Sequence, residues 1–115
     1  MGVLASQMRL MTLIATKNNL EFRQLSITEK MNKLMVQIAE CDEFMGDLDP
    51  NSPEVQTMNT EKRRLNEYEK KLQMQQQALA TRLQQVQAEI GACQNTLVAG
   101  IQQSGLFTYG MIGGR

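Results

Sequence analysis

The short acidic segment around the first proline holds the densest set of side chains that could bind a cation. Asp47, Asp49 and Asn51 alternate along it, and carboxylate and amide oxygens are the ligands that Ca²⁺ prefers in proteins. A calcium loop that begins in this way also needs Gly at its sixth position and Glu at its twelfth. Ser52 and Met58 stand at those two positions instead. The sequence therefore predicts no metal site here.

Catalytic chemistry has few candidates elsewhere in the chain. There is no His, the side chain that most often serves as a general base at neutral pH. Neither standard phosphate-binding Gly pattern occurs, and no Ser, Cys or Lys has an evident activating partner. Cys41 and Cys93 are far apart, fit no metal-binding spacing and fall on apolar patterns, where they act as small hydrophobic residues. We predict that the protein is not an enzyme and uses no cofactor and no metal.

The composition is typical of a helical bundle or coiled coil. The 115 residues are 42% hydrophobic but only 4% aromatic, and none is Trp. The twelve basic and twelve acidic residues give a net charge of zero, which provides no general attraction to nucleic acid. No segment approaches the roughly 20 consecutive apolar residues that a membrane-spanning helix requires. We therefore expect a helical protein with no nucleic-acid partner and no transmembrane segment.

Both prolines of the chain lie in one short turn, formed by Asp49, Pro50, Asn51, Ser52 and Pro53. A proline biases the preceding residue away from helical dihedral angles, but it is well tolerated in the first turn of a helix. Ser52 is a favourable N-cap for a helix that begins at Pro53. The predicted elements of this single domain, 1–115, are a helix over 4–47, a turn over 48–53, a helix over 53–104 and a tail over 105–115. The predicted fold is all-α, a long two-helix antiparallel hairpin (coiled coil) with a short Gly-rich tail.

Heptad spacing of apolar residues supports the coiled coil. In the first helix the pattern comprises Ile27, Met31, Leu34, Ile38, Cys41, Met45 and Leu48. In the second helix it comprises Leu65, Tyr68, Leu72, a polar step at Gln75 or Gln76, Leu79, Leu83, Val86, Ile90, Cys93, Leu97 and Ile101. Gly91 and Gly100 interrupt this second pattern, either as tolerated defects or as points where another backbone approaches closely.

The beginning of the first helix is apolar over more than one stripe, so we expect contacts on more than one side. A single hairpin partner cannot cover all of these residues, which indicates contact with another subunit. The tail is also apolar, unlike most disordered tails, and either packs against a neighbouring subunit or is a frayed terminus. The predicted inter-subunit contacts are Leu10, Met11, Leu13 and Ile14 in the first helix and Leu106, Phe107 and Tyr109 in the tail.

The Pro-Asn-Ser-Pro turn between two helices, together with Glu67 and Tyr68 in the second helix, resembles the needle subunits of bacterial type III secretion systems. Such subunits are helical hairpins that polymerise into a hollow filament. The resemblance implies a homo-oligomer or polymer on the bacterial cell surface or outside the cell, in contact with other secretion-apparatus proteins. The first ten residues are also similar to short, uncharacterised coiled-coil proteins of gut-associated bacteria, which have no known activity.

Two functions follow as hypotheses. The first is a self-assembling structural subunit of a needle-like filament or tube for protein secretion. The alternative is a discrete coiled-coil adaptor or secretion chaperone, a cytoplasmic dimer or tetramer that binds a partner helix on its Met-rich surface. A third and weaker option places the apolar segment over residues 3–15 on a membrane surface, with little basic anchoring. The sequence leaves the redox state of both cysteines open.

Overall fold

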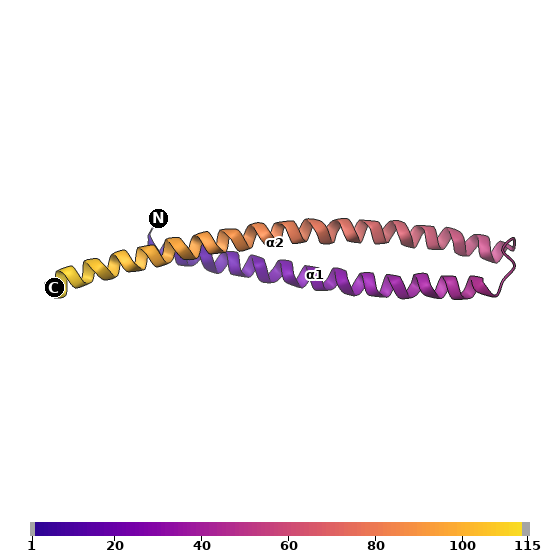
Figure 1. Ribbon diagram of the computed structural model, residues 1–115, viewed down its shortest axis with the longest axis horizontal. Coiled ribbons are helices and arrows are strands. Elements are labelled where there is room, and N and C mark those ends of the chain that lie inside the picture. The colour runs from indigo at the N-terminus through magenta and orange to yellow at the C-terminus, as the bar shows by residue number, and fades with distance from the viewer. Residues whose placement is uncertain (1, 114–115) are drawn as a thin grey trace. The chain divides into compact units, whose positions relative to one another are not determined.

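The computed structural model consists of two α-helices joined by a short turn (Figure 1). It describes the backbone of residues 2–113 and the side chains of residues 2–103. Helix α1 spans Val3–Gly46 and helix α2 spans Pro53–Gly113, and no strand occurs in the described backbone. The predicted all-α fold, a two-helix antiparallel hairpin, is confirmed.

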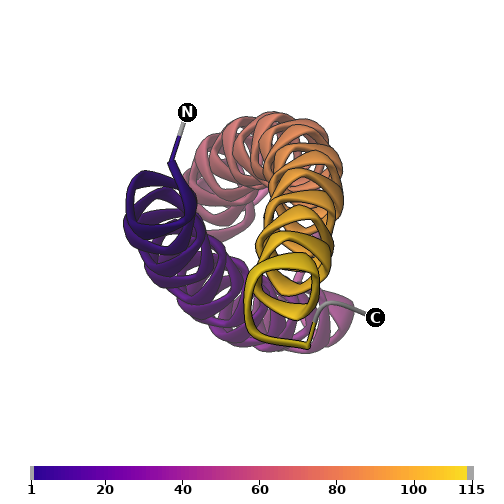
Figure 2. The ribbon, with the colours of Figure 1, turned by 90° about the vertical axis from the view of Figure 1, so that its left-hand side faces the viewer.

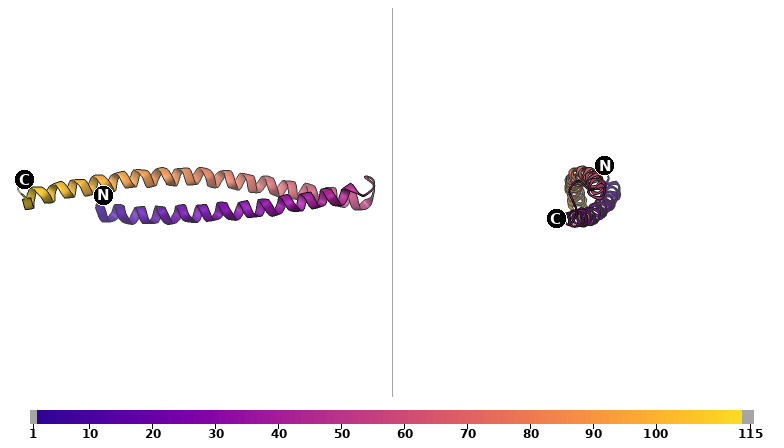
Figure 3. Two further views of the ribbon diagram at one scale, coloured as in Figure 1. Left: turned by 60° about the horizontal axis from the view of Figure 1, so that its bottom comes forward. Right: turned by 90° about the vertical axis from the view of Figure 1, so that its right-hand side faces the viewer.

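The chain divides into two compact units, each of which contains a segment of both helices. Unit 1 comprises Met1–Glu21 and Thr81–Arg115, and unit 2 comprises Phe22–Ala80. Figure 2 shows the start of α1 in indigo and the later part of α2 in orange and yellow. The turn that joins the helices belongs to unit 2 and is seen at one end of the left panel of Figure 3.

The core of unit 2 is a line of aliphatic side chains between its two helical segments. Ile27 and Leu34 of α1 and Leu65 and Leu72 of α2 are buried together. Around them pack four half-buried residues, Met31, Ile38, Cys41 and Leu79. The buried residues on each helix are seven positions apart, the repeat of an antiparallel coiled coil. We call this line of contact, and its counterpart in unit 1, the seam.

The seam of unit 1 contains smaller residues. Leu13 and Leu20 of α1 and Val86 of α2 are buried, in the same heptad positions as the core residues of unit 2. At the next position on each helix, moving towards the chain termini, stand Ser6 and Cys93, and both are also buried. Small side chains at these positions allow the two backbones to lie close together.

Backbone and side-chain hydrogen bonds define the turn. The Asn51 N–H donates to Asp49 Oδ1 at 3.0 Å, and the Ser52 N–H donates to the Asp49 carbonyl at 2.9 Å. The Val55 N–H in turn donates to Ser52 Oγ at 3.3 Å. Ser52 therefore caps α2 as the sequence suggests, since it satisfies one of the free N–H groups of the first turn.

The predicted seam of α2 is wrong at two positions. Tyr68 and Ile101 are exposed, and the half-buried residues in their place are Glu69 and Gly100. The heptad register set by Leu65 passes through Glu69 and Gly100, although neither residue has a large apolar side chain. One residue along a helix turns the side chain by about 100°, which moves Tyr68 off the seam.

The two glycines of the α2 pattern play different roles. A Cβ atom on Gly100 would lie 3.2 Å from Val3 Cγ2, so this glycine permits a close approach of α1 within unit 1. A Cβ atom on Gly91 would meet nothing within 4 Å. Gly91 is therefore a tolerated helix interior glycine, which costs about 1 kcal/mol relative to Ala.

Helix α2 extends past its predicted end at residue 104. It continues through Gly105 and ends at Gly113. The backbone of the segment predicted as a non-helical tail is thus helical over most of its length. Isolated glycines lower helix propensity but do not forbid a helix, and the residues between them here are mostly larger and apolar.

Candidate interaction surface

The first turns of α1 carry a row of large apolar side chains that no described side chain of unit 1 covers. Leu4 is 70% exposed, Met8 is 62% exposed and Met11 is 71% exposed. Together with the exposed Ala15 they follow steps of four, three and four residues, so they form one line along the helix. We call these four residues the outer stripe.

The outer stripe lies on the face of α1 opposite the seam of unit 1. Leu4 precedes Ser6 by two positions, and Met11 precedes Leu13 by two positions. Two positions correspond to a rotation of about 200° around the helix. Because α2 packs against the face that carries Ser6 and Leu13, it does not reach the outer stripe.

Polar groups beside the outer stripe are satisfied locally. Thr12 Oγ1 donates to the Met8 carbonyl at 3.1 Å, and Thr16 Oγ1 donates to the Thr12 carbonyl at 3.0 Å. Arg9 lies nearer to α2 and pairs with Glu89 at 3.6 Å. This ion pair is exposed and therefore contributes little to stability. The two threonine hydroxyls already donate to carbonyls of their own helix. A second chain would therefore bind the outer stripe mainly through hydrophobic contacts.

The residues predicted from the sequence to contact another subunit fall into three groups. Met11 and Ile14 are exposed, with Ile14 at the edge of the outer stripe. Leu13 is buried in the seam, and Leu10 is half-buried. The side chains of Leu106, Phe107 and Tyr109 lie outside the described residues. In the α1 segment of unit 1, the exposed apolar surface is therefore formed by Met11 and Ile14 together with Leu4 and Met8, which the prediction did not single out.

The residues of the hairpin turn form a closed local network rather than a ligand site. Asp49 accepts two N–H groups of the turn, one at its side chain and one at its carbonyl, and Ser52 caps α2. The two prolines, Pro50 and Pro53, have no N–H to donate. Among the described residues, no group of three or more His, Cys, Asp or Glu side chains is placed to hold a metal ion.

An exposed ion pair in unit 2, between Glu61 and Arg64, shifts the pKa values of both side chains. The hydrogen bond from the Arg64 guanidinium holds the pKa of Glu61 below its ordinary value, and the same bond raises the pKa of Arg64. Both groups are exposed to solvent and have the charges that they would carry at neutral pH without each other. The pair links side chains one turn apart in α2. Both shifts move the pKa away from neutral pH, whereas a general acid or base needs a pKa near neutral.

The two cysteines are free and belong to different units. Cys93 is buried in unit 1, where its thiol donates to the Ser6 carbonyl with a sulfur–oxygen distance of 3.2 Å. Cys41 is half-buried in unit 2, where it packs against the core. Both fill seam positions, as expected from their place in the apolar patterns of the sequence.

No family model, curated protein or solved structure matches this chain. The resemblance to secretion needle subunits therefore rests on the turn and the residues beside it. Neither helix, over its described part, has a stretch long and apolar enough to cross a membrane.

Proposed function

We propose that the chain is a structural subunit that assembles with copies of itself into a helical filament or tube. The outer stripe is the observation that supports this proposal. It places three large side chains in solvent, each at least 62% exposed, on the side of α1 that faces away from α2. Full burial of one such side chain contributes about 1.5–3 kcal/mol, so covering the stripe is strongly favourable.

The spacing of the outer stripe suits a helix as its partner. Steps of three and four residues are those of a coiled-coil contact, in which side chains of one helix fill holes on another. A polymer also needs a second, different surface, because contact between unlike surfaces leaves both ends of the assembly open. The apolar residues Leu106, Phe107 and Tyr109 are the proposed second surface. The needle-like form and the role in protein secretion are proposed from the resemblance of the turn.

An adaptor function is the alternative, and the two methionines of the outer stripe favour it. Met8 and Met11 are flexible and polarisable, and such residues adapt to helices of different sequence. On this proposal the stripe holds a partner helix of another protein, and the chain forms a discrete cytoplasmic dimer or tetramer. The size of the purified assembly separates the two functions, because an adaptor has a finite mass.

Substitution within the outer stripe tests the proposal. Met11→Glu places a charge at the centre of the stripe, where burial against another chain would be strongly unfavourable. Gln94→Glu is the matched control, since it adds the same charge at an exposed position of α2 in the same unit. We expect filaments from the wild type and from Gln94→Glu, and none from Met11→Glu, by negative-stain electron microscopy.

Circular dichroism of the same samples checks that Met11→Glu remains helical. Full-length filaments from a helical Met11→Glu protein would exclude the outer stripe as the assembly contact. A discrete species of two to four chains from the wild type would favour the adaptor.

A further inference from the structure

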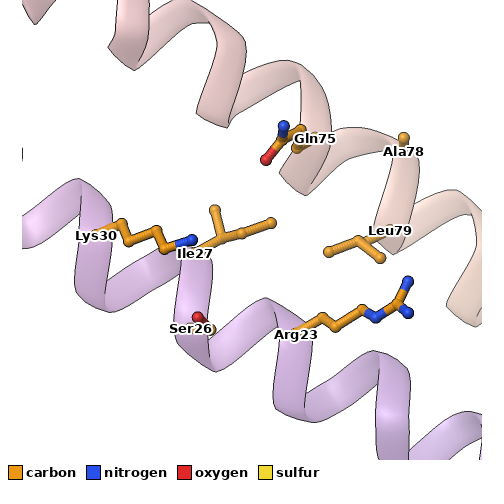
Figure 4. A pocket seen from close by; sticks show the side chains of 7 residues that line it. All are labelled: Arg23, Ser26, Ile27, Lys30, Gln75, Ala78 and Leu79. Atoms are coloured by element: carbon orange, nitrogen blue, oxygen red, sulfur yellow. The ribbon is translucent and has the colours of Figure 1, made fainter.

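A groove with a basic rim runs along one side of unit 2. It has a volume of about 390 Å³, and Ile27, Ala78 and Leu79 form its apolar part (Figure 4). Arg23 and Lys30 flank it on α1, one turn to either side of Ile27. Among the described residues, neither cation takes part in an ion pair or a hydrogen bond. The groove therefore offers apolar contact beside two unpaired positive charges.

A projecting aromatic residue with acidic neighbours lies near the turn of the same unit. Phe44 is 52% exposed. It shares a surface hollow with Glu40, Glu43 and Asp47. None of these three carboxylates forms an ion pair with another described residue. We call Phe44 and these three carboxylates the acidic knob.

The basic groove and the acidic knob lie on the same side of the hairpin. Arg23, Lys30, Gln37 and Phe44 recur every seven residues, so they share one heptad position on α1. They also line a continuous series of hollows. Lys30 and Gln37 line the hollow that follows the basic groove, and Gln37 and Phe44 line the next one.

Two cations and two carboxylates along this side are arranged symmetrically about Met35. Arg23 precedes Met35 by twelve residues and Asp47 follows it by twelve, while Lys30 precedes it by five and Glu40 follows it by five. When two copies of one helix lie antiparallel about a two-fold axis at this midpoint, Arg23 and Lys30 each meet a carboxylate of the other copy. Lys33, which lines the next hollow, meets Gln37 instead.

We propose that unit 2 binds a second copy of the chain through this side, with the two copies antiparallel. The Phe44 side chain of each copy enters the basic groove of the other, and ion pairs form from Arg23 to Asp47 and from Lys30 to Glu40. In an antiparallel two-fold dimer, each of these contacts forms twice, once from each copy. In a parallel, staggered dimer each contact would form only once. The product is a four-helix arrangement that covers the half-buried residues along the seam of both copies.

This contact uses other residues than the outer stripe and does not rest on the proposed filament. A second copy of the chain fits the basic groove because its acidic knob carries the opposite charge. Glu40 and Asp47 are also seven residues apart, as Arg23 and Lys30 are. Like charges brought together across such an interface are repulsive, and opposite charges set its register. The interface is therefore specific for the antiparallel pair.

Charge reversal on each half of the interface provides the test. One variant carries Arg23→Glu and Lys30→Glu, and the other carries Glu40→Lys and Asp47→Lys. Either variant alone brings like charges together in the proposed dimer, so we expect its dimerisation to be at least roughly tenfold weaker than that of the parent. An equimolar mixture restores all four ion pairs in a heterodimer, and we expect its affinity to return to within a few-fold of the parent.

Sedimentation equilibrium measures these affinities, and Met11→Glu is included in every chain so that assembly through the outer stripe does not contribute. Circular dichroism checks that both reversed chains are helical. Unweakened dimers of either helical variant, or a mixture that stays monomeric, would overturn the proposed contact. So would a monomeric Met11→Glu parent.

The outcomes for the two proposals are separable. Dimers that follow the charge-reversal pattern, without filaments from the wild type, would support this contact and contradict the filament. Filaments from the wild type together with a monomeric Met11→Glu parent would support the outer stripe alone.

Discussion

The Cys93 thiol lies 3.2 Å from the Ser6 carbonyl oxygen, and this contact joins α2 to α1 inside unit 1. Both residues are buried, although both are small. Larger residues would push the two backbones apart at this level. The small pair therefore sets the helix spacing near the start of α1, where the outer stripe lies on the opposite face.

Burial predicts unequal reactivity of the two cysteines. Cys93 is buried and its thiol is hydrogen-bonded, whereas Cys41 is half-buried. We expect a thiol-specific reagent to modify Cys41 several-fold faster than Cys93 under native conditions, because access to the thiol controls the rate. Single-cysteine variants, each with the other cysteine replaced by Ala, assign the two rates. Equal rates for the two cysteines in the folded protein would contradict the placement of Cys93.

The core of unit 2 predicts a large loss of stability on truncation of Leu72. This side chain is only 2% exposed and belongs to the main hydrophobic cluster. Leu72→Ala should lower the free energy of unfolding by about 2–5 kcal/mol, through lost burial and a residual cavity. Met74→Ala, two positions along the same helix but 70% exposed, is the control and should change it by less than about 0.5 kcal/mol. Urea titration followed by circular dichroism measures both, and similar effects of the two substitutions would contradict the heptad register.

The N-cap of α2 predicts a smaller, local effect. Ser52→Ala removes the acceptor of the Val55 N–H and should lower stability by about 1 kcal/mol. Gln56→Ala, at an exposed position one turn later, leaves the cap intact and serves as the control. Hydrogen exchange of the Val55 amide locates the effect, since loss of the cap should speed exchange there. Unchanged exchange at Val55 would mean that the cap does not protect this turn.

Filament assembly is predicted to depend on one residue in each of the two surfaces that are proposed to meet. Ile14→Glu changes an exposed residue at the edge of the outer stripe, and Phe107→Glu changes the proposed second surface. Each should abolish polymer formation, measured by light scattering, while the helical signal in circular dichroism remains nearly unchanged. Undiminished polymer from a helical Ile14→Glu or Phe107→Glu protein would contradict the proposed role of that residue.

Much of the fold could be predicted because local chemistry and heptad spacing agree. The turn has both prolines and the Ser52 cap, and the seam from Ile27 to Leu48 has an apolar residue at every expected position. In α2 the signal is ambiguous at one step. Tyr68 is apolar and Glu69 is charged, so the residue types favour Tyr68, whereas the register fixed by Leu65 and Leu72 places Glu69 on the seam.

The outer stripe was only partly predictable. The excess of apolar residues at the start of α1 indicated contacts on several sides, but it did not separate the two faces. Extending the heptad register of Ile27 backwards assigns Leu20 and Leu13 to the seam and leaves Met11 outside. The end of α2 was missed for a different reason. Glycine is a frequent helix C-cap, and Gly105 matched that role locally although the helix continues to Gly113.

Negative-stain electron microscopy of the purified wild-type chain, with light scattering on the same sample, tests self-assembly most directly. We predict long filaments of uniform width and a scattering mass that grows with protein concentration. A single sharp species of two to four chains, unchanged on concentration, would contradict the filament.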